Sequence, residues 1–248
     1  MRLYRDFPGA SMSMGASGRL CMLLRDTLSM ERIDHVIETG TFNGLGSTKF
    51  VSESFPKGRP PRQFVTIETN WSSWCQAKRN LRQFSFVLPL WGKTVPLDRA
   101  LQFLDTDDVL RNHHNYPDIF IDDTSDPLQF YREEAKGRLG GVSKNPRLAI
   151  HRMFDRILFY AGDNLLEKYL LKFRSANPLV ILDSAGGIGF LEFSILEEVM
   201  RNHPYLICLD DVHHIKHFRS AIHIKNDPHF RLLGVDELEG WLLAKHLP

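Results

Sequence analysis

The sequence predicts an α/β fold, a doubly wound and mainly parallel sheet of seven strands. Two observations support this prediction. Short apolar or β-branched runs alternate with segments of helical pattern along most of the 248 residues. One of these runs, residues 205–209, is apolar throughout, as a strand that is buried on both faces should be. We therefore expect one domain over residues 1–248, with ligands bound at the carboxyl ends of the strands.

Three units of strand followed by helix are expected in the first half of the chain. The strand at 35–38 runs into a glycine-containing loop, and the strand at 63–68 follows a connector rich in proline and arginine. A helix is expected at 96–110, because leucines recur at helical spacing behind a proline in its first turn. The other expected elements are a strand at 84–90 and helices at 47–54 and 72–81.

The alternation loosens between about residues 113 and 160, where glycine, proline and polar residues interrupt it. We expect a partly helical insertion here, before the fourth strand, which acts as a lid and has a helical run near 148–160. Asp122 and Asp123 are interpreted as part of this lid and not as a strand end. Beyond it, strands are expected at 179–183, 205–210, 230–235 and 241–247, and helices at 164–174, 190–202 and 215–224.

Charge and cysteine content narrow the classes of function. The formal net charge is +1 and the basic residues are scattered, so we expect no nucleic-acid partner and favour a small-molecule ligand. Cys21, Cys75 and Cys208 are odd in number and lack CxxC spacing, which disfavours a disulfide framework or a structural zinc site. No apolar run approaches the roughly 20 residues of a membrane span, and residues 1–18 lack the apolar core of a signal peptide. We expect a cytoplasmic protein without a membrane partner, and a homo-oligomer stays open.

The loop after the first expected strand is the most informative segment. It reads Glu38-Thr39-Gly40-Thr41-Phe42-Asn43-Gly44-Leu45-Gly46-Ser47. Its glycines stand where a strand must turn sharply and where the backbone can approach a ligand. The spacing GxxxGxG differs from the GxGxxG of dinucleotide enzymes, and no lysine stands where a phosphate-binding GxxxxGK[ST] loop requires one. The loop therefore fits neither NAD nor ATP well.

The order E-x-G-x-x-x-G with a nearby serine resembles the first motif of class I methyltransferases, especially the catechol and sugar O-methyltransferase groups. The resemblance covers the alternating parts of the chain and not the insertion. It implies a Rossmann-like fold that binds S-adenosylmethionine, with the loop under the methionine portion of the cofactor. Glu68, which ends the second strand, would accept hydrogen bonds from both ribose hydroxyls. The residues implied around the cofactor are Glu38, Gly40, Thr41, Phe42, Gly44, Ser47, Glu68, Trp71, Gly92 and Thr94.

The alternative is an ordinary turn between a strand and a helix. In that interpretation Glu68 is a solvated strand end and Trp71 packs on the sheet. It is the joint order of these features along the chain that favours a cofactor.

Three aspartates follow the fourth and fifth expected strands. Asp183 ends one strand and Asp210 and Asp211 end the other, so a parallel sheet would bring them together beside the glycine loop. Carboxylates that close together need a cation or a proton, and hard oxygen ligands suit Mg²⁺. The resemblance also implies Mg²⁺ here, because metal-dependent O-methyltransferases carry acids at these places. The alternative is that the aspartates cap helices or shape the pocket.

The residue that would take a proton from the acceptor is not obvious. Catechol-type enzymes place a lysine, and some sugar enzymes a histidine, three residues after the first aspartate, whereas this chain has Gly186. The expected catalytic residues are His214 first and His213 second, together with Asp183, because imidazole titrates near neutrality. These histidines also fit a solvated surface, and His213 with His217 fits a metal-binding pair.

The expected function is Mg²⁺-dependent methyl transfer from S-adenosylmethionine to a hydroxyl of a small molecule, a sugar or another natural product. Three alternatives stay open: a metal-free class I methyltransferase, a nicotinamide-dependent oxidoreductase, and a non-catalytic Rossmann-like interaction module.

Overall fold

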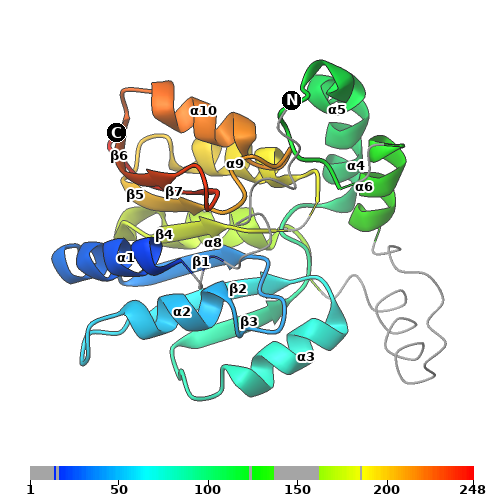
Figure 1. Ribbon diagram of the computed structural model, residues 1–248. Coiled ribbons are helices and arrows are strands. Elements are labelled where there is room, and N and C mark those ends of the chain that lie inside the picture. Colours follow the sequence, from blue (N-terminus) through cyan, green and yellow to red (C-terminus); the bar gives the residue numbers. More distant parts are fainter. Residues whose placement is uncertain (1–13, 15–16, 123–124, 137–161, 185) are drawn as a thin grey trace.

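The computed structural model describes Met14 and residues 17–122, 125–136, 162–184 and 186–248. Its centre is a seven-stranded sheet in the order β3-β2-β1-β4-β5-β7-β6 (Figure 1). Strands β1 to β5 run parallel, and β7 pairs antiparallel with both β5 and β6. This confirms the predicted doubly wound, mainly parallel sheet. The strands are β1 His35–Thr39, β2 Gln63–Glu68, β3 Val87–Trp91, β4 Leu179–Leu182, β5 Tyr205–Leu209, β6 Phe230–Asp236 and β7 Trp241–His246.

The strand order reverses between β1 and β4. The chain builds outward from β1 through β2 to β3, and then crosses to the other side of β1 to place β4. Thr39, the last residue of β1, is in register with Ile67 of β2 and Leu182 of β4. Ligands of open α/β sheets bind in the crevice outside the carboxyl ends at such a reversal. The loops after β1, β2, β4 and β5 are therefore where the site is expected.

Helices cover both faces of the sheet, because successive strand residues point to opposite sides. Val36 and Ile181 face α1 (Gly18–Met30) and α2 (Ser47–Ser54), whereas Ile37 and Val180 face α8 (Leu165–Phe173) and α9 (Gly189–Met200). Fully burying one such aliphatic side chain is worth about 1.5–3 kcal/mol relative to exposure. The two buried layers therefore hold the strand ends in fixed positions. The remaining helices around the sheet are α3 Trp71–Asn80, η4 Arg174–Ala176 and α10 Phe218–Asn226.

A third apolar cluster lies beside the carboxyl ends of β4 and β5. Leu104, Leu110 and Tyr131 pack there with Ile215, which belongs to the loop after β5. The cluster attaches a small helical group to the sheet, visible at one side of the molecule in Figure 1. Its helices are α4 Leu97–Thr106, α5 Asp108–Arg111, η3 His113–Asn115 and α6 Pro127–Ala135.

Several predicted boundaries were wrong. The helix expected at 96–110 is divided, because Asp107 leaves the helical conformation and its carboxylate accepts a hydrogen bond from the Leu110 amide at 2.8 Å, which starts a new helix. The helix expected from 215 begins only at Phe218, and the strand expected from 84 begins at Val87. Helix α1 was not predicted. The expected helical run at 148–160 and the second half of the insertion lie outside the described residues.

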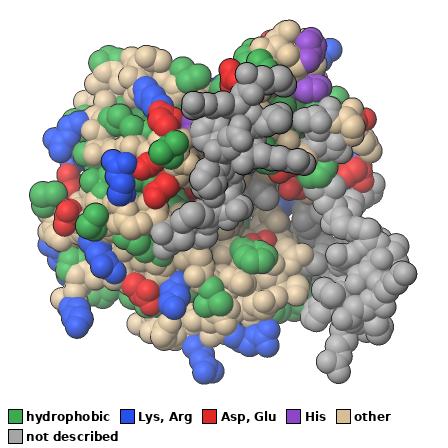
Figure 2. Space-filling view, in the orientation of Figure 1, with side chains coloured by type: hydrophobic (Ala, Val, Ile, Leu, Met, Phe, Trp, Pro, Cys, Tyr) green, Lys and Arg blue, Asp and Glu red, His purple; other side chains and the backbone are tan. Residues whose placement is uncertain are grey.

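Within the described ranges, no helix is both long and apolar enough to cross a membrane. Basic and acidic side chains are interspersed over the described part of the face shown in Figure 2.

Candidate functional site

The loop after β1 has the backbone that its glycines predicted. Gly40 and Gly44 have φ angles of 86° and 78°, which favour glycine. A Cβ on Gly40 would lie 2.2 Å from the carbonyl oxygen of Asp183, and one on Gly44 would lie 2.7 Å from the side chain of Leu81. The amides of Gly40 and Thr41 both donate to the carbonyl of Ile67. The loop is thus clamped between the ends of β2 and β4.

Glu38 is a fully buried carboxyl at the base of this loop. Its Oε2 accepts hydrogen bonds from the hydroxyls of Thr48 and Thr66, both at 2.6 Å, and Thr66 in turn contacts the hydroxyl of Thr41. Oε1 has no hydrogen-bond partner among the described residues. Burial raises the pKa of Glu38 to about 7, against the effect of the neighbouring hydroxyls. A buried acceptor without a partner is costly unless a ligand supplies a donor.

Helix α2 starts next to this carboxyl and presents an open amino end. Its N-cap is Gly46, which provides no side-chain hydrogen bond, and Ser47 is buried in the first turn. Uncapped amides at a helix start attract an anion. Glu38 and the start of α2 can therefore hold an ammonium and a carboxylate side by side, which are the two groups of an amino acid.

Glu68 ends β2 and fixes the two loops on either side of it. Its Oε2 accepts from the amide of Phe42 at 2.6 Å, and its Oε1 accepts from the amide of Asn70 at 2.7 Å. A carboxylate can accept about four hydrogen bonds. Phe42 itself has a φ of 50°, and the residue is 67% exposed.

Trp71 lies in an aromatic cluster at the ends of β2 and β3. Its ring centroid is 4.8 Å from that of Trp74 and 4.7 Å from that of Trp91. The indole of Trp91 donates to the carbonyl of Thr69 at 3.0 Å. The three rings form an apolar, half-buried surface beside Glu68, of the kind on which a planar base can stack.

The loop after β3 is buried more deeply than the sequence suggested. The amide of Gly92 donates to the carbonyl of Glu68, and a Cβ on Gly92 would lie 2.8 Å from the carbonyl of Gly162. Thr94 donates its hydroxyl to Glu192, a fully buried carboxylate of α9 that also accepts from Thr39 and Ser184. Gly92 thus lies near Glu68, whereas the side chain of Thr94 joins β3 to α9.

The three aspartates meet, as predicted, at the ends of β4 and β5. One carboxylate oxygen of each of Asp183, Asp210 and Asp211 lies within 4.8 Å of the others. Burial raises the pKa of Asp183 to about 6, and burial with repulsion between the acids raises the pKa of Asp210 well above its usual range. We refer to these residues as the aspartate trio.

Lys216 places its ammonium among the trio, which the sequence interpretation missed. Its Nζ lies 2.9 Å from Oδ2 of Asp211 and 3.3 Å from Oδ1 of Asp183, and its side chain is only 6% exposed. Burial alone would favour the neutral amine, but the carboxylates raise the pKa of Lys216 above its ordinary value. The trio therefore already contains one positive charge. The available signal was Lys216 itself, which follows the predicted base candidate His214 by two residues.

The histidines after β5 make other contacts. His214 is buried, its Nδ1 accepts from the amide of Lys216 at 3.1 Å, and its Nε2 lies 3.0 Å from Oδ2 of Asp122. This network assigns the ring proton to Nε2, which donates to Asp122. Nε2 of His213 lies 2.6 Å from the carbonyl of Glu237. His217 is fully buried, and neither ring nitrogen has a partner among the described residues.

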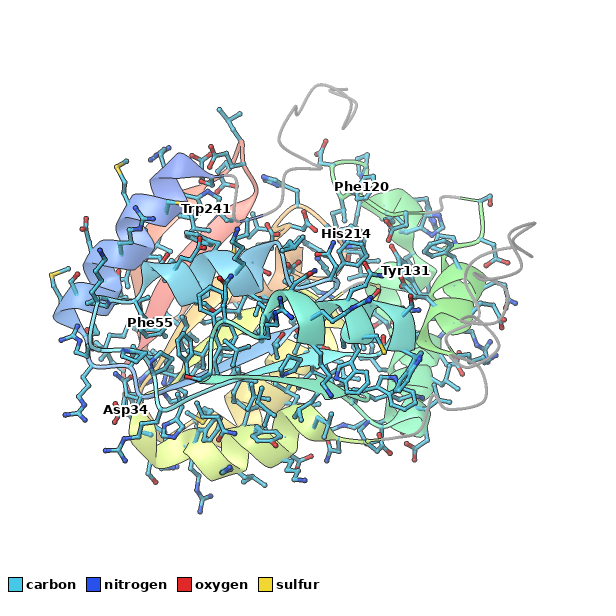
Figure 3. All side chains as sticks on the ribbon, turned by 90° about the horizontal axis from the view of Figure 1, so that it is seen from below. Asp34, Phe55, Phe120, Tyr131, His214 and Trp241 are labelled. Atoms are coloured by element: carbon cyan, nitrogen blue, oxygen red, sulfur yellow. The ribbon has the colours of Figure 1, made fainter. Side chains whose placement is uncertain are left out.

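The described part of the insertion is docked onto the site. The Phe120 amide donates to the His213 carbonyl at 2.9 Å, and the Ile215 amide donates to the Phe120 carbonyl at 3.0 Å. Asp122 also accepts from the hydroxyl of Tyr131 at 3.1 Å. Figure 3 shows Phe120, His214 and Tyr131 close together. Asp122, interpreted from the sequence as lid, thus reaches the loop that carries the expected base.

Helix α6 of the insertion supplies a second carboxyl that the sequence did not indicate. A Cβ on Gly186 would lie 2.1 Å from Oε2 of Glu134, so the Glu134 carboxyl occupies the space that a side chain at 186 would take. Burial raises the pKa of Glu134 to about 7, and the nearby Asp122 adds to the shift while Lys216 opposes it. The Glu134 carboxyl therefore lies beside Gly186, the position at which catechol-type enzymes carry a lysine.

Comparison with known proteins gives matches of structure but not of sequence. No protein-family profile matches the chain, and no curated protein matches it. An O-methyltransferase from Bacillus cereus, solved with S-adenosylhomocysteine, is 12% identical, with 98% of this chain and 86% of that chain covered and a TM-score of 0.49. The O-methyltransferase TomG from Streptomyces achromogenes, solved with S-adenosylmethionine, is 14% identical, with 98% and 85% covered and a TM-score of 0.44. A putative caffeoyl-CoA O-methyltransferase from Staphylococcus aureus is also 14% identical, with 98% and 90% covered and a TM-score of 0.44.

Proposed function

We propose that this chain is an enzyme that transfers the methyl group of S-adenosylmethionine to a hydroxyl of a small molecule, such as a sugar or another natural product. One observation carries the proposal: a set of groups suited to the cofactor and a set suited to a hydroxyl acceptor meet at one sheet edge. Gly40 joins the two sets, because its absent Cβ lets the loop after β1 touch the backbone of Asp183.

The groups around β1 and β2 match the cofactor part by part. The free oxygen of Glu38 accepts from the α-ammonium of the methionine portion, and the open start of α2 receives its carboxylate. Glu68 accepts from the ribose hydroxyls, and Trp71 offers a face to the adenine. A positive sulfonium then lies toward the aspartate trio, whose negative charge favours it.

Methyl transfer requires the protein to align the two reactants and to stabilise their charges, and it does not require a covalent bond to the protein. An acceptor hydroxyl held at the trio can be aligned in line with the sulfonium methyl, which turns a bimolecular encounter into an oriented step. The sign of charge at the trio also disfavours acceptors that carry a carboxylate or phosphate near the reacting hydroxyl. A neutral polyol or aromatic diol fits best.

The positive charge at the trio has two possible sources. The donor set fits Mg²⁺ in kind and number, with Asp183, Asp210 and Asp211 as the ligands and an acceptor oxygen completing the shell. The position of Lys216 argues against a bound metal ion. Its ammonium contacts one carboxylate oxygen of Asp183 and one of Asp211, and a metal ion would have to compete with the ammonium for these oxygens. The contacts favour Lys216 as the resident cation and hence the metal-free form of the reaction.

Calorimetry tests the function and the cation together. Wild-type protein should bind S-adenosylmethionine and S-adenosylhomocysteine and should not bind NAD, whereas absence of cofactor binding would identify a non-catalytic module. With Lys216 as the cation, Mg²⁺ should give no heat with wild type and EDTA should leave turnover unchanged. Mg²⁺ binding that Asp210→Asn abolishes, together with EDTA-sensitive turnover, would establish the metal-dependent form instead.

A further inference from the structure

We propose that Glu134, on α6 of the insertion, accepts the proton of the acceptor hydroxyl during methyl transfer. This inference rests on the proposed function and names a residue for it.

The position of Glu134 follows from the loop after β4. Gly186 has a φ of 91° and stands three residues after Asp183, and the Glu134 carboxyl occupies the space that a side chain at 186 would take. The neighbouring Gly187 leaves room in the same way for Tyr131, one helical turn before Glu134 on α6. Two adjacent glycines thus let one face of α6 press against the loop that also carries Asp183.

The charges that face Glu134 come from three elements. Asp122 of the insertion raises the proton affinity of Glu134 and Lys216 of the loop after β5 lowers it, while Tyr131 lies one turn away on the same helix. Burial contributes most, and the resulting pKa of about 7 suits a base that works near neutral pH. No side-chain hydrogen bond of Glu134 is found among the described residues.

The other candidates in the site are less suited to accept a proton. Lys216 holds its proton firmly, since the carboxylates around it raise its pKa. Both ring nitrogens of His214 are engaged, Nδ1 by the Lys216 amide and Nε2 by Asp122. The Asp122 carboxylate is in turn occupied by His214 and Tyr131, and these contacts lower its pKa.

The step balances without another reactant. The acceptor oxygen forms its bond to the methyl carbon as the carbon–sulfur bond breaks, and the electron pair of that bond stays on sulfur. The sulfonium becomes the neutral thioether of S-adenosylhomocysteine. The hydroxyl proton moves to the Glu134 carboxylate, which becomes a neutral acid and later releases the proton to water.

The first test follows the proton and needs no acceptor. In protein labelled with ¹³C at the glutamate side-chain carboxyls and loaded with S-adenosylhomocysteine, Glu134→Gln should remove one resonance that titrates near neutral pH. The matched control is Glu133→Gln, the same change on the adjacent residue of α6, which pairs with Lys136 and should leave that resonance in place. A Glu134 resonance that titrates near an ordinary glutamate pKa of about 4.3 would overturn the inference.

The second test measures turnover, with catechol as a neutral aromatic diol for the probe acceptor. Glu134→Gln should lower kcat by about 10²–10⁴-fold, leave the cofactor Kd unchanged and remove the rise of kcat with pH, while Glu133→Gln matches wild type. Glu134→Asp should keep the pH dependence at a lower rate. Wild-type turnover combined with an undiminished rate in Glu134→Gln would refute the role of Glu134 and leave the proposed function intact, whereas a wild type that binds no cofactor would refute the proposed function itself.

Discussion

The two halves of the proposed site are assembled in different ways: the cofactor side, formed by the loop after β1 with Glu38 and Glu68, and the acceptor side, formed by the aspartate trio with Lys216 and the insertion. On the cofactor side, contacts lie within one βα unit or between neighbouring ones: Glu38 contacts Thr48, ten positions away, and Phe42 contacts Glu68, 26 positions away. On the acceptor side, His214 meets Asp122 across 92 positions. The first half of the site is therefore encoded in local patterns, and the second depends on where an insertion docks.

The two sides also balance their buried carboxyls differently. On the cofactor side the donors are neutral groups: hydroxyls donate hydrogen bonds to Glu38, and backbone amides donate hydrogen bonds to Glu68. The acceptor side uses a full charge, the ammonium of Lys216. Removing a buried charge costs more than removing a neutral donor, so the two sides should respond to mutation on different scales.

The largest expected effect is that of Lys216→Met. It leaves the aspartate trio without its ammonium, and breaking a buried ion pair from one side costs about 3–5 kcal/mol of unfolding free energy. Urea denaturation at pH 7.5 should show this loss, and Asp211→Asn added to the variant should restore part of it, because Asp211 is one of the two carboxylates that pair with Lys216.

Lys225→Met is the control for this substitution. Lys225 pairs with Glu237 at the surface, so the change should cost less than about 1 kcal/mol. Equal losses for the two lysine variants would show that charge does not hold the acceptor side together.

The next effect is that of Gly186→Ala. A Cβ there meets Glu134 and the φ of 91° is unfavourable for alanine, so we expect a loss of about 1–3 kcal/mol by thermal or urea unfolding. Gly58→Ala separates the two causes, because Gly58 has a φ of 82° but no atom within 4 Å of its Cβ. The double variant Gly186→Ala with Glu134→Ala should recover the difference, and its failure to do so would contradict the contact between Gly186 and Glu134.

On the cofactor side, Glu68→Ala should act on binding. It removes the acceptor for the ribose and frees the amides of Phe42 and Asn70, so the affinity for S-adenosylhomocysteine should fall about tenfold or more, equivalent to about 1.4 kcal/mol. Calorimetry measures the change against Glu53→Ala, an exposed glutamate of α2 that should bind as wild type does. Wild-type affinity in Glu68→Ala would remove the ribose assignment.

A pH dependence of stability is expected from Glu38. Its folded pKa of about 7 exceeds the ordinary 4.5, so the folded state holds a proton that the unfolded chain has released between these values. Its contribution to stability is therefore complete below about pH 4.5 and is lost as pH rises through 7. Glu38→Gln should weaken the decline of unfolding free energy in this window by at most about 1.4 kcal/mol per pH unit. An unchanged slope would show that Glu38 is already ionised.

The sequence predicted the sheet and the backbone of the loop after β1 for a physical reason. Buried strands are short apolar runs, which are visible in a sequence. The glycines of the loop after β1 predicted a sharp turn, and the backbone has positive φ angles at Gly40 and Gly44. The convergence of Asp183 with Asp210 and Asp211 also followed from the rule that parallel strands end at one edge.

The acceptor side could not be derived in the same way. Nothing local to Asp122 or Glu134 indicates that α6 packs against Gly186, because that contact depends on the third apolar cluster and on the bridge between Phe120 and His214. His214 was a predicted base, but its Nε2 lies against Asp122, which comes from a distant segment of the chain. Lys216 was close to the predicted residues in sequence, yet only its burial among the carboxylates distinguishes it from a surface lysine.

The glycine pair at 186 and 187 has a consequence for how such an enzyme can change over time. With the proton acceptor on the insertion, a new lid with a different acceptor pocket must also bring its own carboxyl to the same point, or turnover is lost. A lysine or histidine at 186 would return proton transfer to the sheet, but its Cβ would also displace the Glu134 carboxyl. A change of acceptor pocket would therefore also change the proton acceptor, and the two could be altered independently only by substitutions both at Gly186 and on α6.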